Sequence, residues 1–531
     1  MPRLLAGYSW LVPCLLLLGN GPVAAEEREG GLRRVKHIVI VMQENHSFDN
    51  YFGVLPYVAG GPYHAGPCRR DDHRCVDGLT CSQTASGLTC TNSNVDDDGS
   101  TVASFHSQNY CPGPDLAHGW TGSHQEANFL NPALTRLASP NDGFVLVNDG
   151  LTAPLPDERE QPDIKGESPT DDDTMGYYDQ TDLPFYYGLA QTFAISDRYF
   201  SSVIGPTFPN RSYALAATAF GHVTTAEIFP PLPPVASPGG YKPITGTILD
   251  LLDRQKVSWI NYFSDLPTTA IFRGFDLSHA LPVTAFFDIA DAQTCTLPAV
   301  SFVDPAFGLN TFGNNPTLFE NDEHPPTNIR NGQFFVSQVV AAFRNSACWK
   351  DSILFINYDE HGGFYDHVAP PLAQQGGSRN PDGIDPGQCA DESNPPASEQ
   401  PGGGANCFLS PTDAASICPG FTPTGQYPAF CANFDQLGFR VPFIAVSPFS
   451  KRHYVSHRVA DHTSLLAFIE KRFLGSREDD ESDRPHLTLR DLHASTLEDL
   501  FDFEEAPSAK AAVPAAPAPL PNDPGCPFVA P

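Results

Sequence analysis

Two short polar segments follow directly after apolar, β-branched runs of the chain. Gln43–Asp49 contains Glu44 and Asn45 and comes after residues 38–42, whereas residues 358–363 contain Asp359 and Glu360 and come after residues 353–356. Adjacent carboxylates repel one another unless a cation or solvent stabilises them, and carboxylate and amide oxygens are ligands for hard metal ions. The two segments therefore predict a site for a metal ion and a phosphate oxygen. An ordinary capped turn and an exposed acidic loop are the alternatives.

A third segment, Gly205–Arg211, contains a hydroxyl that can act as a nucleophile. Pro209 is a favourable first helical residue, and we expect an Ala-rich helix to continue from Ser212. Thr207 would then lie at or just before a helix N-terminus, where free N–H groups stabilise an alkoxide or a phosphoryl group. The alternative is that Thr207 only caps the helix.

Histidines supply the remaining candidates. His118, His324 and His462 each lie close after an acidic residue that would orient the imidazole, although a single histidine is more often structural than catalytic. The sequence has no Gly-x-Ser-x-Gly, His-Glu-x-x-His, P-loop or dinucleotide motif. Serine esterases, zincins and nucleotide-dependent enzymes are therefore disfavoured.

Strands and helices that alternate along the chain would position these residues. Continuous apolar runs at 38–42, 353–356 and 441–446 predict strands buried on both faces, and residues 258–262 predict another. Helical spacing is found at 334–343 and 462–473. This pattern predicts an α/β fold with a mostly parallel sheet, in which polar segments meet where the strands end.

Charge restricts the partners. The 531 residues include 62 Asp and Glu against 31 Lys and Arg, a net charge of −31. Such a chain repels nucleic acid and anionic lipid. A phospholipid with a neutral or zwitterionic head group, or a small phosphate ester, remains compatible, and so does transient contact with a membrane surface. No feature of the sequence indicates an obligate protein partner.

The N-terminus predicts export. Residues 1–25 resemble a signal peptide, with Arg3 before a short apolar stretch and cleavage expected after Ala25. We expect a catalytic domain at 26–505 with Cys-rich insertions near 60–115 and 372–436, and an Ala/Pro-rich tail at 506–531. The twelve cysteines that remain favour disulfides in a secreted or periplasmic protein. Five of them lie in the first insertion, so at least one pairs elsewhere or is free.

Four blocks in order resemble the phosphoesterase family that contains bacterial and plant phospholipases C and a bacterial acid phosphatase. They span about residues 35–473 and are Glu44–Gly53, Thr207–Arg211, Asp359–Val368 and Arg440–Ser464. The resemblance implies an alkaline-phosphatase-like three-layer α/β/α sandwich. The two Cys-rich insertions fall outside it.

The resemblance also implies roles for individual residues. It assigns Glu44, Asn45, Asp359 and Glu360 to one divalent metal ion together with Thr207, the nucleophile. Because all these residues would bind the ion through oxygen atoms, calcium, magnesium or manganese is favoured, with zinc and iron as alternatives. His118 and His324 match histidines near the phosphate, and Asn45 would also stabilise its charge. No organic cofactor is implied.

The expected activity is that of a phospholipase C acting on phosphatidylcholine-type lipids through a phosphothreonine intermediate, because phospholipase members carry threonine at this position. An acid phosphatase with the same site is the alternative, and a non-catalytic secreted binding protein is a third. Four aromatic residues near the matched blocks are candidates for a cage around choline, unless they belong to the core: Trp120, Tyr177, Tyr178 and Trp259.

Overall fold

A computed structural model describes twelve stretches of the chain. These are residues 31–85, 87–96, 98–113, 115–148, 171–223, 225, 243–272, 276–308, 320–373, 381–384, 434–475 and 484–513. The expected signal peptide, most of the second Cys-rich insertion and most of the C-terminal tail lie outside them. Among the described residues, no helix is long and apolar enough to cross a membrane.

An eight-stranded sheet forms the centre of the fold, with strand order β10-β9-β11-β1-β12-β13-β8-β14. Every neighbouring pair is parallel except that β13 runs antiparallel to both β12 and β8. In that order, the strands are Ala280–Pro282, Trp259–Phe263, Val300–Asp304, His37–Gln43, Ser352–Tyr358, Phe443–Val446, Ala194–Ser196 and Val455–Ser456.

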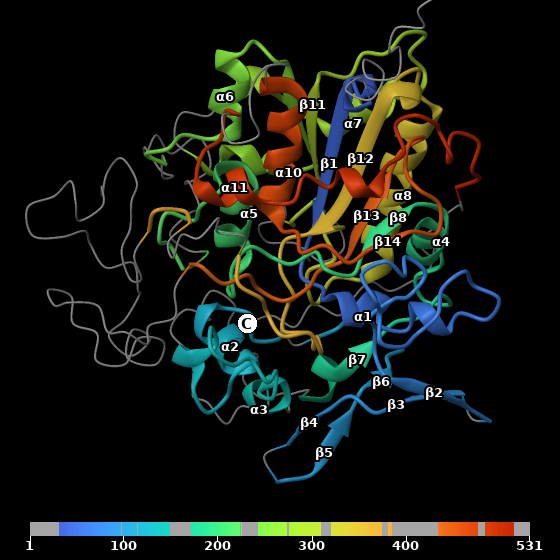
Figure 1. Cartoon of the computed structure of the whole chain (residues 1–531), viewed down its shortest axis with the longest axis vertical. Coiled ribbons are helices and arrows are strands. Elements are labelled where there is room, and N and C mark those ends of the chain that lie inside the picture. The colour runs from blue at the N-terminus through green and yellow to red at the C-terminus, as the bar shows by residue number, and fades with distance from the viewer. Residues whose placement is uncertain are drawn as a thin grey trace, which may run out of the picture.

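Helices cover both faces of this sheet (Figure 1). One layer contains α5, α6, α10 and α11, at Thr207–Ala216, Ile248–Arg254, His462–Ile469 and Leu489–His493. The other contains α4, α7 and α8, at Pro184–Thr192, Val283–Phe287 and Ile329–Asn345. The expected three-layer α/β/α sandwich with a mostly parallel sheet is therefore confirmed.

The apolar runs explain why the central strands lie between two helical layers. All seven residues of β12 are buried, as are the last six of β1. α8 is amphipathic, since Val336, Val339, Val340 and Phe343 form a buried stripe at helical spacing. These side chains pack into one continuous core.

Two predicted elements differ from the structure. The strand expected at 441–446 begins at Phe443, because Pro442 has no N–H for the ladder and lies before the strand. The strand also runs antiparallel to β12. Its start, with Arg440, consequently lies near the ends of β1 and β12. The helix expected from Ser212 begins at Thr207, so Thr207 is itself in the first turn.

A cap of small elements lies at one end of the sheet (Figure 1). It contains α1, α2 and α3, at Phe48–Phe52, Trp120–Ala127 and Phe144–Asn148, and short strands β2–β7, at Cys81–Thr84, Gly87–Cys90, Ser93–Val95, Thr101–Ala103, Phe105–His106 and Gly176–Tyr177. Disulfides join Cys68 to Cys75 and Cys81 to Cys90 within the first insertion.

Two more bridges lie partly or wholly outside this insertion. Cys295 is bonded to Cys348, and Cys111 is also disulfide-bonded. Cys111, the fifth cysteine of the first insertion, therefore pairs with a cysteine outside the insertion. Of the two alternatives expected for it, pairing elsewhere or a free thiol, the first is confirmed. The disulfides fit an oxidising compartment.

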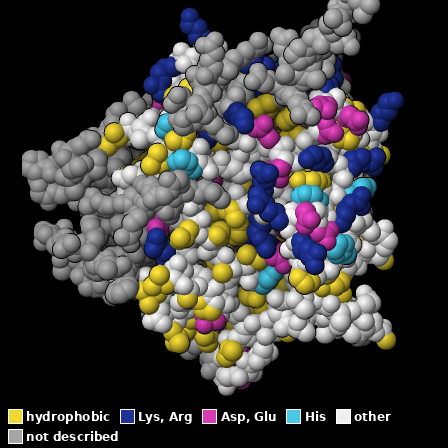
Figure 2. All heavy atoms as spheres, in the orientation of Figure 1, with side chains coloured by type: hydrophobic (Ala, Val, Ile, Leu, Met, Phe, Trp, Pro, Cys, Tyr) yellow, Lys and Arg dark blue, Asp and Glu magenta, His cyan; other side chains and the backbone are white. Residues whose placement is uncertain are grey.

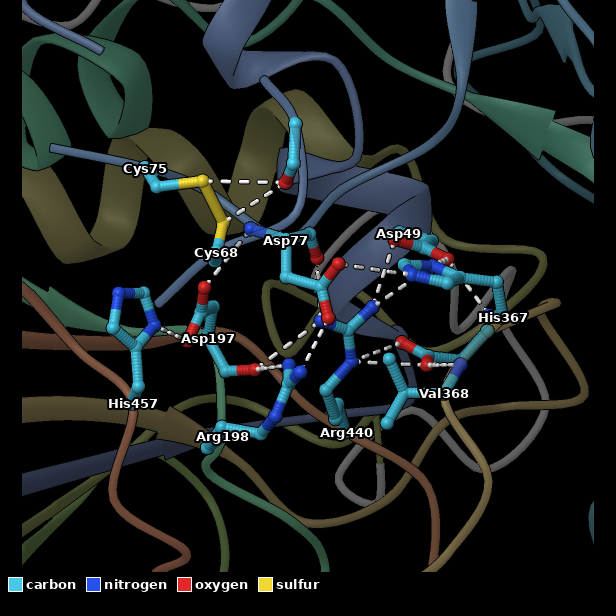
Figure 3. A network of polar contacts seen from close by, with 12 residues as sticks. Asp49, Cys68, Cys75, Asp77, Asp197, Arg198, His367, Val368, Arg440 and His457 are labelled. Carbon is cyan, nitrogen blue, oxygen red and sulfur yellow. Dashed lines mark hydrogen bonds and ion pairs between the residues drawn. A yellow bond between two sulfur atoms is a disulfide. The ribbon is translucent and has the colours of Figure 1, made fainter. Parts of the chain in front are cut away.

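A buried charge network ties the cap to the sheet (Figure 3). Arg440, which is fully buried, donates from Nε to Asp366 at 2.9 Å and from Nη2 to Asp49 of α1 at 2.9 Å. Asp49 also accepts a 2.6 Å bond from His367, whose other nitrogen lies 3.4 Å from Asp77 in the first insertion. The network thus joins α1, the insertion and the approach to β13.

One area of the surface carries side chains of both charge signs (Figure 2). In Figure 2 the basic, acidic and histidine side chains gather on the right, over the part of Figure 1 that holds β8, β13 and β14. Apolar side chains are more frequent at the lower left. On the face shown in Figure 2, the charged side chains of the described residues are therefore concentrated in one area.

His367 should make stability depend on alkaline pH. Burial lowers the pKa of this imidazole, but Asp49 outweighs burial and raises it to about 10, against about 6.5 in an unfolded chain. The folded protein thus holds this proton more tightly, so the stabilisation is complete below about pH 6.5 and is lost as pH rises towards 10. His367→Gln should lower the free energy of unfolding by roughly 3 kcal/mol at pH 6, and by much less at pH 10.

Guanidinium unfolding of both proteins between pH 6 and 10 measures this difference. His64→Gln is the control, because His64 lies in the first insertion with its side chain 54% exposed. A difference between wild type and His367→Gln that stays constant over this range would contradict the assignment.

Candidate active site

The ends of β1 and β12 bring the two polar segments together. The strands pair in parallel with Met42 opposite Asn357 and Gln43 opposite Tyr358, so Glu44–Asn45 and Asp359–Glu360 leave neighbouring strands at the same level. The Asn45 N–H donates to Asp359 Oδ1 at 3.4 Å, and the Glu360 N–H donates to the same oxygen at 2.8 Å. The four side chains are all buried.

Close backbone approach at this edge depends on unusual φ angles. Asn45 has φ +63° and Gly362 has φ +63°. A Cβ at Gly362 would lie 2.2 Å from the Asn45 carbonyl oxygen, which is far inside contact distance. Glycine is therefore required there if the two polar segments are to pack against each other.

Arg211 connects these carboxylates to α5, the helix that carries the predicted nucleophile. Its Nη2 lies 2.9 Å from Glu44 Oε1, and its Nε donates to Asp359 Oδ2 at 3.1 Å. Thr207 lies one turn earlier on α5, and residues four apart share a helix face. Thr207 therefore lies on the same face of α5 as Arg211.

The hydroxyl of Thr207 is not a helix cap. Pro206 occupies the cap position without a side-chain hydrogen bond, and Thr207 is the first helical residue, 6% exposed. The capping alternative for this residue is therefore wrong. Arg211 was inside a matched block but received no predicted role, and its position four residues after Thr207 was the available signal.

His118 adjoins the acidic cluster from the cap. Its Nε2 lies 3.9 Å from Glu360 Oε1 and its Nδ1 lies 3.7 Å from Asp115. His324 packs edge-on against it, with ring centroids 5.5 Å apart. Ligand atoms of Asp115, His118 and His324 all lie within 4.8 Å of one another, so this group is also chemically able to hold a cation.

A second acid–histidine pair supports Glu360 from behind. His361 Nε2 lies 2.7 Å from Glu126 of α2, and its Nδ1 lies 3.2 Å from Glu360 Oε2. Gly362 N–H donates to the same oxygen at 2.7 Å. Glu360 Oε2 is thus fully engaged, which leaves Oε1 directed towards His118.

The neighbouring acids differ in their electrostatic environments. Burial raises the pKa of Asp359 well above its usual value, although Arg211 opposes that rise. Burial also acts to raise the pKa of Glu360, but His118 and His361 outweigh it and the net shift is downward. Two adjacent carboxylates with opposite shifts are typical of a functional site.

Five of the sequence candidates have structural roles. His462 donates from Nε2 to the Asp359 carbonyl oxygen at 2.7 Å and so supports the β12 end. The aromatic residues proposed as a choline cage belong to the core instead, being buried to within a few per cent: Trp120, Tyr177, Tyr178 and Trp259.

The chain is similar to phospholipases C from plants and bacteria. Non-specific phospholipase C6 of Arabidopsis thaliana is 31% identical over 61% of this chain, which spans about half (52%) of that protein. Phospholipase C B of Mycobacterium tuberculosis is 28% identical over 90% of this chain and 80% of its own length. Hemolytic phospholipase C of Pseudomonas aeruginosa is 27% identical over 94% of this chain and 60% of its own.

Among solved structures, murine ectonucleotide pyrophosphatase/phosphodiesterase 5 is 10% identical, with a TM-score of 0.31 over 60% of this chain and 95% of that one. The model of the Phosphoesterase family matches residues 35–474, which include all four sequence blocks and every residue of the site described above. This chain therefore belongs to the Phosphoesterase family.

Proposed function

We propose that this protein is a secreted, metal-dependent phosphoesterase of the phospholipase C type. The observation that carries the proposal is the convergence of Glu44, Asp359 and the Thr207 helix through the buried Arg211. Relatives named phospholipase C support the substrate class. Phosphatidylcholine-type lipids, which yield diacylglycerol and phosphorylcholine, fit a strongly acidic chain because their head group is zwitterionic.

The acidic cluster fits a divalent cation. Glu360 Oε1 and both side-chain polar atoms of Asn45 are buried without a hydrogen-bond partner among the described residues. Such atoms are costly unless a ligand satisfies them. Glu44, Asn45, Asp359 and Glu360 would hold one ion with Thr207, and the oxygen-rich set favours calcium, magnesium or manganese over zinc or iron. Such an ion would neutralise negative charge and favour the alkoxide form of the hydroxyl.

The protein groups then account for the chemical steps. Thr207 Oγ1 releases its proton to solvent and attacks phosphorus in line with the diacylglycerol oxygen, so an O–P bond to threonine forms as the P–O bond to diacylglycerol breaks. The N-terminus of α5 and the Asn45 amide stabilise charge on the equatorial oxygens, as does His118. His324 gives a proton to the leaving oxygen. Water then cleaves the phosphothreonine and releases the phosphorylated head group.

Loss of the Thr207 hydroxyl tests the nucleophile. Thr207→Ala should lower turnover of phosphatidylcholine by at least about 10⁴-fold, since no other group forms the covalent intermediate. Ser212→Ala is the matched control, because Ser212 lies on the same helix, is fully buried, and has an Oγ without a hydrogen-bond partner among the described residues. Product analysis of the purified mature protein measures diacylglycerol release.

The same assay separates the alternatives. Release of phosphate from an aryl phosphate monoester without any diacylglycerol would make the protein a phosphatase on this site. Equal turnover by Thr207→Ala and wild type would remove Thr207 as nucleophile.

Metal binding is tested without reference to activity. Glu360→Gln should weaken binding of the preferred divalent cation by roughly 100-fold or more, because it removes one charged ligand from the set. Calorimetric titration of metal-stripped protein with each candidate cation measures this. Glu505→Gln, at an exposed position, is the control. Equal affinities in the two variants would contradict a site at Glu360.

A further inference from the structure

Glu323 is a buried carboxylate held by three tyrosine hydroxyls. Its Oε2 accepts hydrogen bonds from Tyr51 and Tyr358, each at 2.6 Å. Its Oε1 accepts one from Tyr186, also at 2.6 Å, and a longer one of 3.4 Å from the Gln43 amide. The Glu323 side chain has no exposed surface. Burial raises its pKa to about 7, and the tyrosine hydroxyls oppose that rise.

The donors come from elements that build the candidate site. Tyr358 ends β12 immediately before Asp359, and Gln43 ends β1 immediately before Glu44. Tyr51 lies on α1 and Tyr186 on α4. One carboxylate therefore fixes the segment at 322–324 to both strand ends that carry the acidic cluster.

The backbone of the same segment makes matching contacts. The Glu44 N–H donates to the Asp322 carbonyl at 2.8 Å, and His46 Nε2 donates to the Glu323 carbonyl at 3.0 Å. Glu323 has φ +80°, in the left-handed region that a glutamate rarely adopts. Its side chain lies against Gly332 of α8, where a Cβ would be 2.0 Å from Glu323 Cγ. Such strain persists only where surrounding contacts impose it.

His324 is the next residue, and its orientation follows from this arrangement. Its Nδ1 lies 2.6 Å from the Pro325 carbonyl oxygen. A carbonyl oxygen only accepts, so Nδ1 carries a hydrogen and Nε2 is the nitrogen that exchanges a proton. The ring is thus fixed by its own loop, and that loop is fixed by Glu323.

We propose that Glu323 is a positioning residue: clamped by Tyr51, Tyr186 and Tyr358, it holds the 322–324 segment so that His324 delivers its proton to the leaving oxygen. This inference rests on the proposed function, in which His324 is the general acid. A fold that needed only stability at this position would be served by apolar side chains, because a buried carboxylate carries a desolvation cost. The tyrosine clamp serves orientation instead.

Two adjacent tyrosines provide a matched test. Tyr186 and Tyr187 both lie on α4, are each 1% exposed, and each donate one hydroxyl hydrogen bond. Tyr186 donates to Glu323, whereas Tyr187 donates to the Tyr178 carbonyl oxygen. Tyr186→Phe and Tyr187→Phe should therefore lower the melting temperature similarly, but only Tyr186→Phe should affect proton delivery.

Two substrates with the same head group isolate that step. A short-chain soluble phosphatidylcholine has an alkoxide leaving group that needs a proton, whereas 4-nitrophenyl phosphorylcholine has a leaving group that does not. Tyr186→Phe should lower kcat on the first by roughly 10- to 100-fold and on the second by less than about threefold, since general acid catalysis assists only the poor leaving group. Glu323→Gln should show the same selectivity, and Tyr187→Phe should show none.

A double-mutant cycle completes the test. In a His324→Ala background, Tyr186→Phe should change kcat on the phosphatidylcholine by less than about twofold, because residues that act through one another are not additive. Equal losses on both substrates, or full additivity with His324→Ala, would overturn the inference while leaving the proposed function intact. A wild-type protein that cleaves neither diester would overturn the proposed function, and the inference with it.

Discussion

The parallel pairing of β1 with β12 is the constraint on which the site depends. Because the two strands pair in register, Glu44–Asn45 and Asp359–Glu360 lie at one level of the sheet. Their relative position is set by the strands and does not depend on the conformation of a long loop. The strands are held by burial on both faces rather than by any contact within the site. A dense group of acids thus forms on rigid elements, where the apolar core supplies the stability that the acids themselves reduce.

Buried carboxylates need positively charged or hydrogen-bonding partners, and the chain provides these partners in three separate groups. Arg211 neutralises Glu44 and Asp359 from α5, and the His361–Glu126 pair supports Glu360 from α2. Arg440 forms ion pairs with Asp49 and Asp366 where the cap meets the sheet. Removing one partner from such a pair leaves an uncompensated buried charge, which destabilises the fold.

Glu323 belongs to a different kind of arrangement. Its oxygens accept hydrogen bonds from neutral hydroxyls of α1, α4 and the end of β12. These bonds hold the three elements in place relative to one another and do not neutralise a charge. Because His324 directly follows Glu323, the contacts of Glu323 in the core set the position of His324, the predicted general acid. The histidine is oriented by its scaffold, as a proton donor must be if it is to meet a leaving oxygen within hydrogen-bond distance.

The sequence alone predicted four of the eight strands of the central sheet and the polar segments that follow β1 and β12. Apolar β-branched runs identify buried strands, and polar residues after them identify the edge where ligands bind, because both follow from local composition. The Thr207, Glu44 and Asp359 candidates came from such local patterns and from the resemblance to the family.

Other features were decided only by tertiary structure. The ion pairs of Arg211 and the hydrogen bonds from Tyr51 and Tyr186 to Glu323 join residues more than a hundred positions apart in the chain. The antiparallel direction of β13 depends on which strands are its neighbours. Spacing in a sequence carries no information about such contacts. They form when the core packs, because burial of the apolar faces brings these polar side chains together and buried polar groups need partners.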